Sequence, residues 1–303
     1  MSVSPADAKP LAAARGSVSD FVELMKLRLA SLVLVTTAVG FCIGYSGPTD
    51  PQFFGLLLHC VFGTALVAAG AMVLNQYMER ETDALMERTM ERPIPAGRIT
   101  PGDALVFGTL LAISGIAYLC GVVNVLTGVL ATLTIGSYLF AYTPLKTRTP
   151  LCTLVGAIPG AIPPMMGYAA ATGTIDVYAW TLFAILFIWQ MPHFLAIAWL
   201  YREDYARGRQ LMLPVVDPSG VSTGMQTVLF SLALLPVTLA PTLLRMAGVW
   251  YFGAALLLGL AFLGCAVLVA TARSDRAARQ MFLMSVLYLP ILLGFMVWDR
   301  VAL

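Results

Sequence analysis

The sequence of 303 residues contains few charged residues: Asp, Glu, Lys and Arg together make up 11%, whereas a soluble globular domain carries about 25%. Apolar residues, by contrast, account for 59% of the chain. This composition excludes an ordinary soluble domain, and it excludes a disordered chain, which needs high charge and few apolar residues. The protein is therefore expected to reside in a lipid bilayer.

Patterned cysteines and a strong net charge are also missing. The five cysteines lie in apolar stretches without C-x-x-C or metal-ligand spacing, so we interpret them as packing residues. A formal net charge of +2 gives no reason to expect nucleic acid as a partner.

The first 20 residues lack the basic-then-apolar pattern of a cleaved signal peptide. A bacterial inner (plasma) membrane is the simplest expected location.

Long uncharged stretches predict the fold class. A bilayer-spanning helix needs about 20 apolar residues, and eight stretches without Asp, Glu, Lys or Arg come close to or exceed that length. They cover residues 29–49, 51–78, 104–145, 149–175, 177–201, 218–244, 246–271 and 280–298. The third is about twice the length needed, with a turn expected near 121–124, so we count it as a hairpin. Because lipid offers the backbone no hydrogen bonds and the stretches lack strict alternation, helices are predicted rather than a barrel.

The prediction is an all-α polytopic membrane protein with nine transmembrane helices around a central cavity. Nine spans place the two termini on opposite sides of the membrane. With a cytoplasmic N-terminus, 16 of the 18 basic residues fall on the inner side, and only Arg245 and Arg300 fall outside. We therefore expect residues 1–28 to form a cytoplasmic segment and residues 29–303 to form one membrane domain.

Three helix starts carry a recognisable capping pattern. Asp50-Pro51, Thr100-Pro101 and Asp217-Pro218 each place a capping side chain before a proline at the first helical position. These pairs predict helix boundaries and say nothing about function.

The clearest polar feature is an N-x-x-x-E-x-x-x-D pattern, formed by Asn75, Glu79 and Asp83 where the second helix leaves the membrane. Residues four apart stay near one helix face, so these side chains form a strip of oxygen ligands about 12 Å long. Mg²⁺ binds through one or two carboxylates and completes its shell with water and substrate phosphate. The strip predicts a magnesium site. The alternative is a solvated helix end whose acids pair with Arg80 or Arg88.

Basic residues follow on the same side of the membrane. Arg88 and Arg92 are again four apart, and guanidinium groups match phosphate oxygens bidentately. Together with the acidic strip they suggest the two halves of a metal–diphosphate site. Lys146 and Arg148 end the fourth span, where they are equally consistent with a topology signal alone.

The two histidines differ in their surroundings. His193 follows Pro192 inside the apolar sixth span, and an ionisable side chain there suggests function. The alternative is a neutral histidine that donates to a carbonyl freed by Pro192. His59 lies toward the outer half of its span without expected polar neighbours, so we interpret it as structural.

These segments resemble the UbiA-type intramembrane prenyltransferases. The resemblance covers Lys26-Leu-Arg28 and residues 75–95, 142–164 and 189–214. Its most specific part is Trp-Gln-Met-Pro-His-Phe at 189–194, followed by Arg-Glu-Asp-Tyr at 202–205, Gly208 and Met-Leu-Pro at 212–214. This part separates the members that farnesylate heme B from the rest of the superfamily.

The resemblance implies that residues 29–303 form a prenyltransferase domain whose active site faces the cytoplasm. It would transfer the farnesyl group of farnesyl diphosphate, with addition of water, to a vinyl group of heme B (protoheme IX), giving heme O and diphosphate. Mg²⁺ is the implied cofactor. The implied partners are both substrates and membrane lipid, with a heme A synthase or oxidase assembly proteins as further candidates.

The resemblance also implies residue roles. The catalytic residues and Mg²⁺ ligands would be Asn75, Glu79, Asp83 and Asp204. The diphosphate contacts would be Arg88, Arg92, Lys146, Arg148 and Arg202, and His193 would contact heme.

Some positions depart from the family's pattern. Glu79 stands where Asp is frequent, Leu27 replaces a proline, and Cys152 stands where Asn is common. Asp204 is followed four residues later by Gly208 instead of a second acid. Three alternatives remain open: a related prenyltransferase acting on another aromatic or tetrapyrrole acceptor, a membrane transporter, and an assembly subunit that only holds heme.

Overall fold

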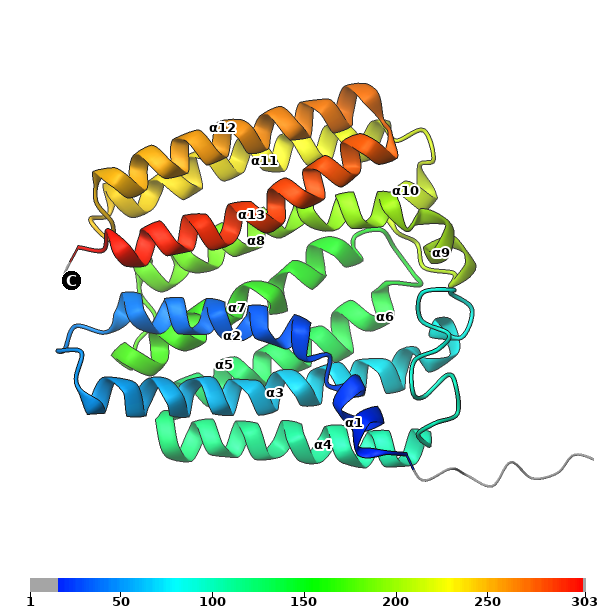
Figure 1. Cartoon of the computed structure of the whole chain (residues 1–303), viewed down its shortest axis with the longest axis horizontal. Coiled ribbons are helices and arrows are strands. Elements are labelled where there is room, and N and C mark those ends of the chain that lie inside the picture. Colours follow the sequence, from blue (N-terminus) through cyan, green and yellow to red (C-terminus); the bar gives the residue numbers. More distant parts are fainter. Residues whose placement is uncertain (1–15, 302–303) are drawn as a thin grey trace, which may run out of the picture.

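The computed structural model describes residues 16–301, and within them the fold is all helical (Figure 1). The single β pairing in this part of the chain is an isolated bridge between Ala247 and Arg300. Part of the predicted cytoplasmic segment 1–28, including Lys9 and Arg15, lies outside the described residues.

Nine helical segments of the described chain are long and apolar enough to cross a membrane, which confirms the predicted count. They are α2 (Leu27–Gly44), α3 (Pro51–Asp83), α4 (Pro101–Tyr118) continued by the π-helical η2 (Leu119–Val123), α5 (Val125–Gly136) continued by the π-helical η3 (Ser137–Tyr142) and α6 (Thr143–Leu145), α7 (Cys152–Thr172), α8 (Val177–Leu200), α11 (Val221–Leu243), α12 (Val249–Ala272) and α13 (Asp275–Trp298). The hairpin predicted in the third stretch turns at Asn124, whose side chain caps α5. Three short helices lie outside the spans: α1 (Val18–Leu24), α9 (Arg202–Arg207) and α10 (Leu213–Val216).

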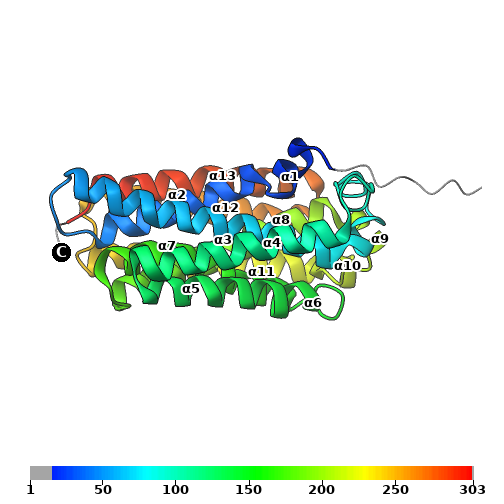
Figure 2. The ribbon, with the colours of Figure 1, turned by 90° about the horizontal axis from the view of Figure 1, so that it is seen from below.

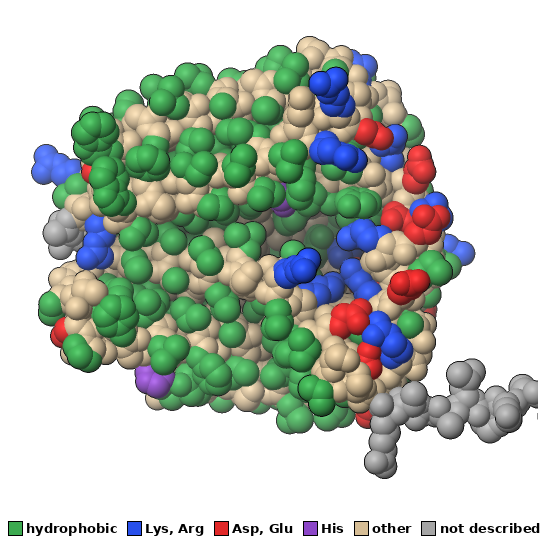
Figure 3. All heavy atoms as spheres, viewed as in Figure 1, with side chains coloured by type: hydrophobic (Ala, Val, Ile, Leu, Met, Phe, Trp, Pro, Cys, Tyr) green, Lys and Arg blue, Asp and Glu red, His purple; other side chains and the backbone are tan. Residues whose placement is uncertain are grey.

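The spans run side by side, with α8 packed against α7, α11 and α13 (Figures 1 and 2). The short helices α1, α9 and α10 gather at one end of the bundle, at the right in Figure 1. In Figure 3 most charged side chains of the visible face gather at that same end, while hydrophobic side chains cover the length of the spans. Large apolar side chains of the spans, such as Leu110, Leu243 and Leu257, are exposed. The protein is therefore a multi-pass membrane protein with a polar end.

Helices α2 and α7 touch backbone to backbone. A Cβ added at Gly40 would lie 1.9 Å from the Pro164 carbonyl oxygen, and one at Gly167 would lie 1.8 Å from the Thr37 carbonyl oxygen. Neither position has room for a larger residue, so the two glycines set the spacing of these helices. Contacts with α2, α8 and α5 together bury most of α7.

Two of the three predicted capping pairs are confirmed. Asp50 accepts a hydrogen bond from the Phe53 amide (3.0 Å) and Thr100 accepts one from the Asp103 amide (3.1 Å), each with proline at the first position. The prediction for Asp217 is wrong because α11 begins only at Val221. The Asp217 carboxylate instead accepts hydrogen bonds in the preceding turn, from Ser219 first and then Ser222, which hold its pKa at about 2.

Two further expectations need correction. The last span begins at Asp275 and not near residue 280, because Ser274 caps a helix whose first turns carry exposed charges. His59 has a polar neighbour after all, since its Nδ1 lies 2.6 Å from the Tyr118 hydroxyl. That hydrogen bond joins α3 to α4, in keeping with a structural role.

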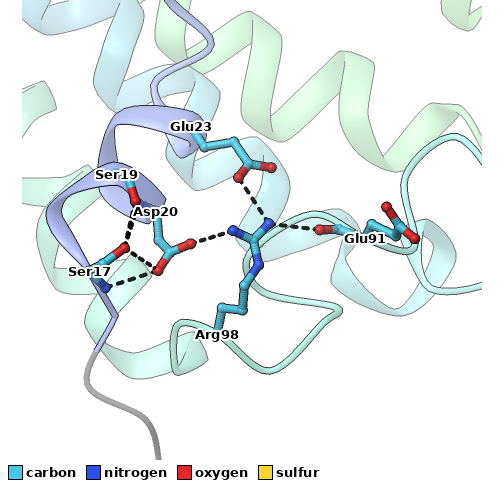
Figure 4. Close-up of polar contacts among 6 residues, drawn as sticks. All are labelled: Ser17, Ser19, Asp20, Glu23, Glu91 and Arg98. Carbon is cyan, nitrogen blue, oxygen red and sulfur yellow. Dashed lines mark hydrogen bonds and ion pairs between the residues drawn. The ribbon is translucent and has the colours of Figure 1, made fainter.

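Arg98 ties α1 to the loop between α3 and α4 (Figure 4). Its guanidinium donates to Asp20, to Glu23 (2.9 Å) and to the Glu91 carbonyl (2.8 Å). From the other side, Gln76 of α3 donates to the Leu24 carbonyl at the end of α1 (2.7 Å). These contacts fix the segment that leads directly into Lys26 and the start of α2.

We predict that Arg98→Ala loosens α1 without unfolding the bundle. Partly exposed ion pairs contribute about 1 kcal/mol, so amide exchange in residues 17–26 should accelerate about fivefold. Hydrogen exchange with mass spectrometry measures this effect. Arg276→Ala, at an exposed arginine of α13, is the control. Equal exchange in both variants would show that Arg98 does not hold α1.

Candidate active site

The acidic strip lies on a buried face of α3. Asn75, Glu79 and Asp83 are only 2%, 7% and 1% exposed, although they occupy the polar end of the helix. Their spacing of four residues keeps them near one face, as expected. Because the three side chains face protein, a solvated helix end does not describe them.

Each buried acid is paired with a cation from a later loop. Lys146 Nζ lies 2.7 Å from Glu79 Oε1, and Arg92 lies 2.5 Å from Asp83 Oδ2. Burial acts to lower the pKa of Lys146, but the Glu79 carboxylate and the Tyr142 and Tyr138 rings outweigh it and hold the pKa well above the usual range. The sequence predicted these residues separately, and the fold brings them together.

Thr143 orients the remaining member of the strip. The Asn75 amide nitrogen donates to Thr143 Oγ1 (3.1 Å), which in turn donates to the Tyr138 carbonyl (2.9 Å). Thr143 follows the π-helical segment η3, a feature that often marks functional sites. With its nitrogen engaged, the Asn75 amide has its oxygen as the atom left to bind another group.

Lys26 is a site residue that sequence reasoning did not assign. It caps α2 in a left-handed conformation (φ +47°), an uncommon backbone state for a residue other than glycine. Burial, followed by the nearby charges of Arg92 and Lys146, lowers the pKa of Lys26 to about 7. The available signal was its place in the Lys26-Leu-Arg28 segment, just before the first span.

Asp204 belongs to an adjacent group of residues at the same end. Its Oδ1 accepts hydrogen bonds from the Glu87 amide (3.1 Å) and from Arg207 (2.6 Å). Burial acts to raise the pKa of Asp204, but these hydrogen bonds hold it below the usual value. The guanidinium of Arg88 lies over the Tyr201 ring, 4.9 Å from its centroid. The segment 83–88 therefore connects the acidic strip to Asp204.

Two predicted diphosphate contacts, Arg148 and Arg202, make no ion pair with the acidic strip. Arg202 pairs with Asp275 (2.7 Å) and donates to the Trp199 carbonyl (2.8 Å). It shares with Asp204 a pocket of about 230 Å³. Arg148 is exposed and makes no ion pair with any described residue. Their diphosphate roles stay predictions.

The departure at Gly208 has a packing reason. A Cβ at this position would lie 2.8 Å from Met86 Sδ, and the Met86 side chain is buried. A second acid four residues after Asp204 would therefore displace the buried Met86 side chain. Cys152 is likewise fully buried, with its sulfur 3.8 Å from Met212 Sδ.

The donor set has few ligands for a metal ion. Among residues 16–301, no three His, Cys, Asp or Glu side chains lie close enough together to hold one. The strip offers two carboxylates and one amide oxygen, and Mg²⁺ characteristically takes such a small protein contribution before substrate phosphate completes its shell. The residues present therefore fit this ion better than one that needs an all-protein cage.

His193 lies among aromatic rings in α8. Its ring stacks on Trp189 (centroids 4.9 Å apart) and on Phe282 of α13 (5.4 Å). Its Nδ1 lies 2.7 Å from Ser285 Oγ, so the polar partner is a serine and not a carbonyl freed by Pro192. Figure 3 shows a hollow in the middle of the visible face, bordered by Lys and Arg side chains toward the polar end, which fits the predicted central cavity.

The chain belongs to the UbiA prenyltransferase family, whose model matches residues 33–289. Among its relatives, a protoheme IX farnesyltransferase of Solibacter usitatus is 48% identical over 93% of this chain and 98% of its own length. A protoheme IX farnesyltransferase of Koribacter versatilis is 43% identical over 96% of this chain and 98% of its own length.

Solved structures share the fold at low sequence identity. The structure of a digeranylgeranylglyceryl phosphate synthase is similar with a TM-score of 0.76 and 17% identity, over 94% of this chain and 99% of the other. A UbiA homolog from Archaeoglobus fulgidus bound to GPP and Mg²⁺ gives a TM-score of 0.66 and 14% identity, over 91% and 99%. These likenesses establish the architecture.

We predict that Lys146→Met destabilises the protein because it leaves Glu79 buried without a cation. Removing one partner of a buried pair costs about 3 kcal/mol. Unfolding in mixed micelles measures the cost, and Arg148→Met, at the exposed neighbouring cation, is the control. The double variant Glu79→Met with Lys146→Met should recover part of the loss. Equal stability of the Lys146→Met and Arg148→Met variants would contradict the pairing of Lys146 with Glu79.

Proposed function

We propose that this protein transfers the farnesyl group of farnesyl diphosphate, with addition of water, to a vinyl group of heme B, giving heme O and diphosphate. The observation that carries the proposal is the buried rim in which Glu79 and Asp83 pair with Lys146 and Arg92. The names of the relatives described above support the acceptor.

Asn75, Glu79 and Asp83 would hold Mg²⁺, with Asp204 contributing from the adjacent group. When bound, this ion would stabilise the negative charge that develops on the departing diphosphate. Thr143 would keep the Asn75 oxygen directed toward the ion by holding the amide nitrogen.

The cations of the rim would bind the diphosphate. Arg92 and Lys146 balance the two carboxylates of Glu79 and Asp83, and Lys26, whose pKa is about 7, would become fully protonated beside a bound polyanion. Arg92 and Lys146 would exchange their carboxylate partners for phosphate oxygens. The C–O bond of the allylic carbon then breaks and its electron pair leaves with the diphosphate. Arg88, Arg148 and Arg202 would contact the same group from the surrounding loops.

The apolar interior would protect the allylic cation from premature capture by water. The terminal carbon of the heme vinyl group attacks this cation and forms the new carbon–carbon bond. The positive charge moves to the carbon next to the porphyrin ring, where water adds and releases a proton, leaving a hydroxyl group. His193 would contact the heme from α8.

Two other functions fit the molecule less well. A transporter spreads ionisable residues along a path across the bilayer, whereas the charged side chains visible in Figure 3 gather mainly at one end. A subunit that only holds heme leaves the paired acids and cations without a purpose. A related enzyme with another acceptor would share the rim and differ around His193.

The bacterial inner membrane is the proposed location, with the N-terminus and the active site on the cytoplasmic side. The excess of basic residues at the polar end supports this orientation. A heme A synthase or an oxidase assembly protein would take up the product.

We predict that Asp83→Asn lowers turnover by well over tenfold while heme binding stays nearly intact. The assay combines purified protein, heme B, farnesyl diphosphate and Mg²⁺, with mass spectrometry of the extracted porphyrin. The wild type should give a farnesyl-plus-water adduct. Glu81→Gln, at an acid that is 84% exposed on the same helix, is the matched control. Wild-type turnover in Asp83→Asn, with ordinary magnesium dependence, would contradict the assignment.

We also predict which loops face the cytoplasm. In a background without the five native cysteines, a membrane-impermeant maleimide should label Ser46→Cys on intact cells. It should label Ser219→Cys only after the membrane is opened. Both serines are exposed, at opposite ends of the bundle. The reverse labelling pattern would place the active site on the outer side.

A further inference from the structure

Ser285 is a buried polar residue that the proposed mechanism does not use. It is 0% exposed in the middle of α13, among residues that are mostly apolar. Three groups meet at this serine. Its hydroxyl lies 2.6 Å from the Phe282 carbonyl and 2.7 Å from His193 Nδ1, and its own carbonyl accepts a hydrogen bond from Trp189 Nε1 (3.1 Å).

The single hydroxyl proton decides the direction of the contact with His193. A carbonyl oxygen only accepts, so the 2.6 Å contact with Phe282 requires the Ser285 proton to lie between the two oxygens. The Ser285 oxygen must then accept from His193, and Nδ1 must carry the hydrogen. In a neutral imidazole this leaves a lone pair on Nε2.

The surrounding rings hold the imidazole in one orientation. Trp189 lies nearly parallel to it on one side (17°) and Phe282 stacks on it as well (28°). The Trp189 ring is itself anchored to the Ser285 carbonyl. Among the described residues, Nε2 has no hydrogen-bond partner, and the His193 side chain is only partly buried. The lone pair is therefore directed at a position that the protein leaves to another molecule.

We propose that Ser285 is a positioning residue that fixes His193 as the Nδ1–H tautomer and so presents the Nε2 lone pair to the iron of the porphyrin substrate. This inference rests on the proposed function, because it takes heme B as the acceptor. Ligation of iron requires an unprotonated ring nitrogen, and a hydrogen bond at the other nitrogen sets which nitrogen that is. Ligation of the iron by His193 would also fix the distance between the porphyrin and the rim.

The tautomer is directly measurable because the chain has only two histidines. In protein labelled with ¹⁵N-histidine, the variant His59→Gln contains only one histidine, so all histidine nitrogen signals come from His193. Nitrogen NMR at neutral pH without heme should show a protonated Nδ1 and an unprotonated Nε2. Ser285→Ala should redistribute the tautomers, and Ser285→Thr should retain the wild-type pattern. A protonated Nε2 in the wild type would overturn the proposal.

Porphyrin binding tests the consequence. Titration of purified protein with heme B and with iron-free protoporphyrin IX separates ligation of iron from packing of the ring. Ser285→Ala should weaken heme affinity about tenfold, as loss of a hydrogen bond behind a metal ligand does, and leave protoporphyrin IX affinity unchanged. His193→Ala should change the heme absorption spectrum as well.

The control is Ser231→Ala, at a buried serine of α11 that donates to the Thr227 carbonyl and makes no hydrogen bond with a described histidine. Equal affinity losses for both porphyrins in Ser285→Ala, or no loss for either, would overturn the role of Ser285. The proposed function would be unaffected, because the farnesyl transfer assay tests it separately. Failure of the wild type to bind heme B would instead overturn the proposed function together with this inference.

Discussion

Charged groups at the polar end of this bundle must neutralise one another in place, because a carboxylate or ammonium removed from water costs several kcal/mol unless it is paired. The pairs of Glu79 with Lys146 and Asp83 with Arg92 meet this requirement. They join the end of α3 to two later loops that fold back over it. In the proposed mechanism, a metal ion would replace the cations beside the carboxylates, and the diphosphate would replace the carboxylates beside the cations.

Further polar contacts lie beside this rim and deeper in the bundle. Asn75 and Thr143 form a neutral hydrogen bond beside the ion pairs. Within α8, Gln190 donates to the Ala157 carbonyl of α7 (3.3 Å) and His193 meets Ser285 among aromatic rings. A molecule with a polyanionic head and a long apolar body would fit a charged rim above an apolar interior, and so would a flat porphyrin that needs one nitrogen ligand. In the proposed mechanism, this arrangement would keep the diphosphate at the rim and the porphyrin in the apolar interior.

The fold was largely predictable from the sequence, because a bilayer imposes helix length and apolar composition directly. Local chemistry also placed the starts after Asp50 and Thr100, and it failed at Asp217 because two nearby serines capture that carboxylate in a turn. The acids and arginines of the site were visible as residue types at helical spacing. Their partners were not, since the contacts of Lys146 with Glu79 and of Ser285 with His193 join segments far apart in the chain. A lone serine in an apolar span gives no local signal of its role.

The exchange of partners at the rim is tested most directly by binding of an unreactive thio-analogue of farnesyl diphosphate to the purified protein, measured by calorimetry with Mg²⁺ and again after chelation. The account predicts binding that depends on the metal, because only a cation that replaces Lys146 and Arg92 on the carboxylates frees both side chains for phosphate. Binding of equal strength without any divalent ion would contradict it.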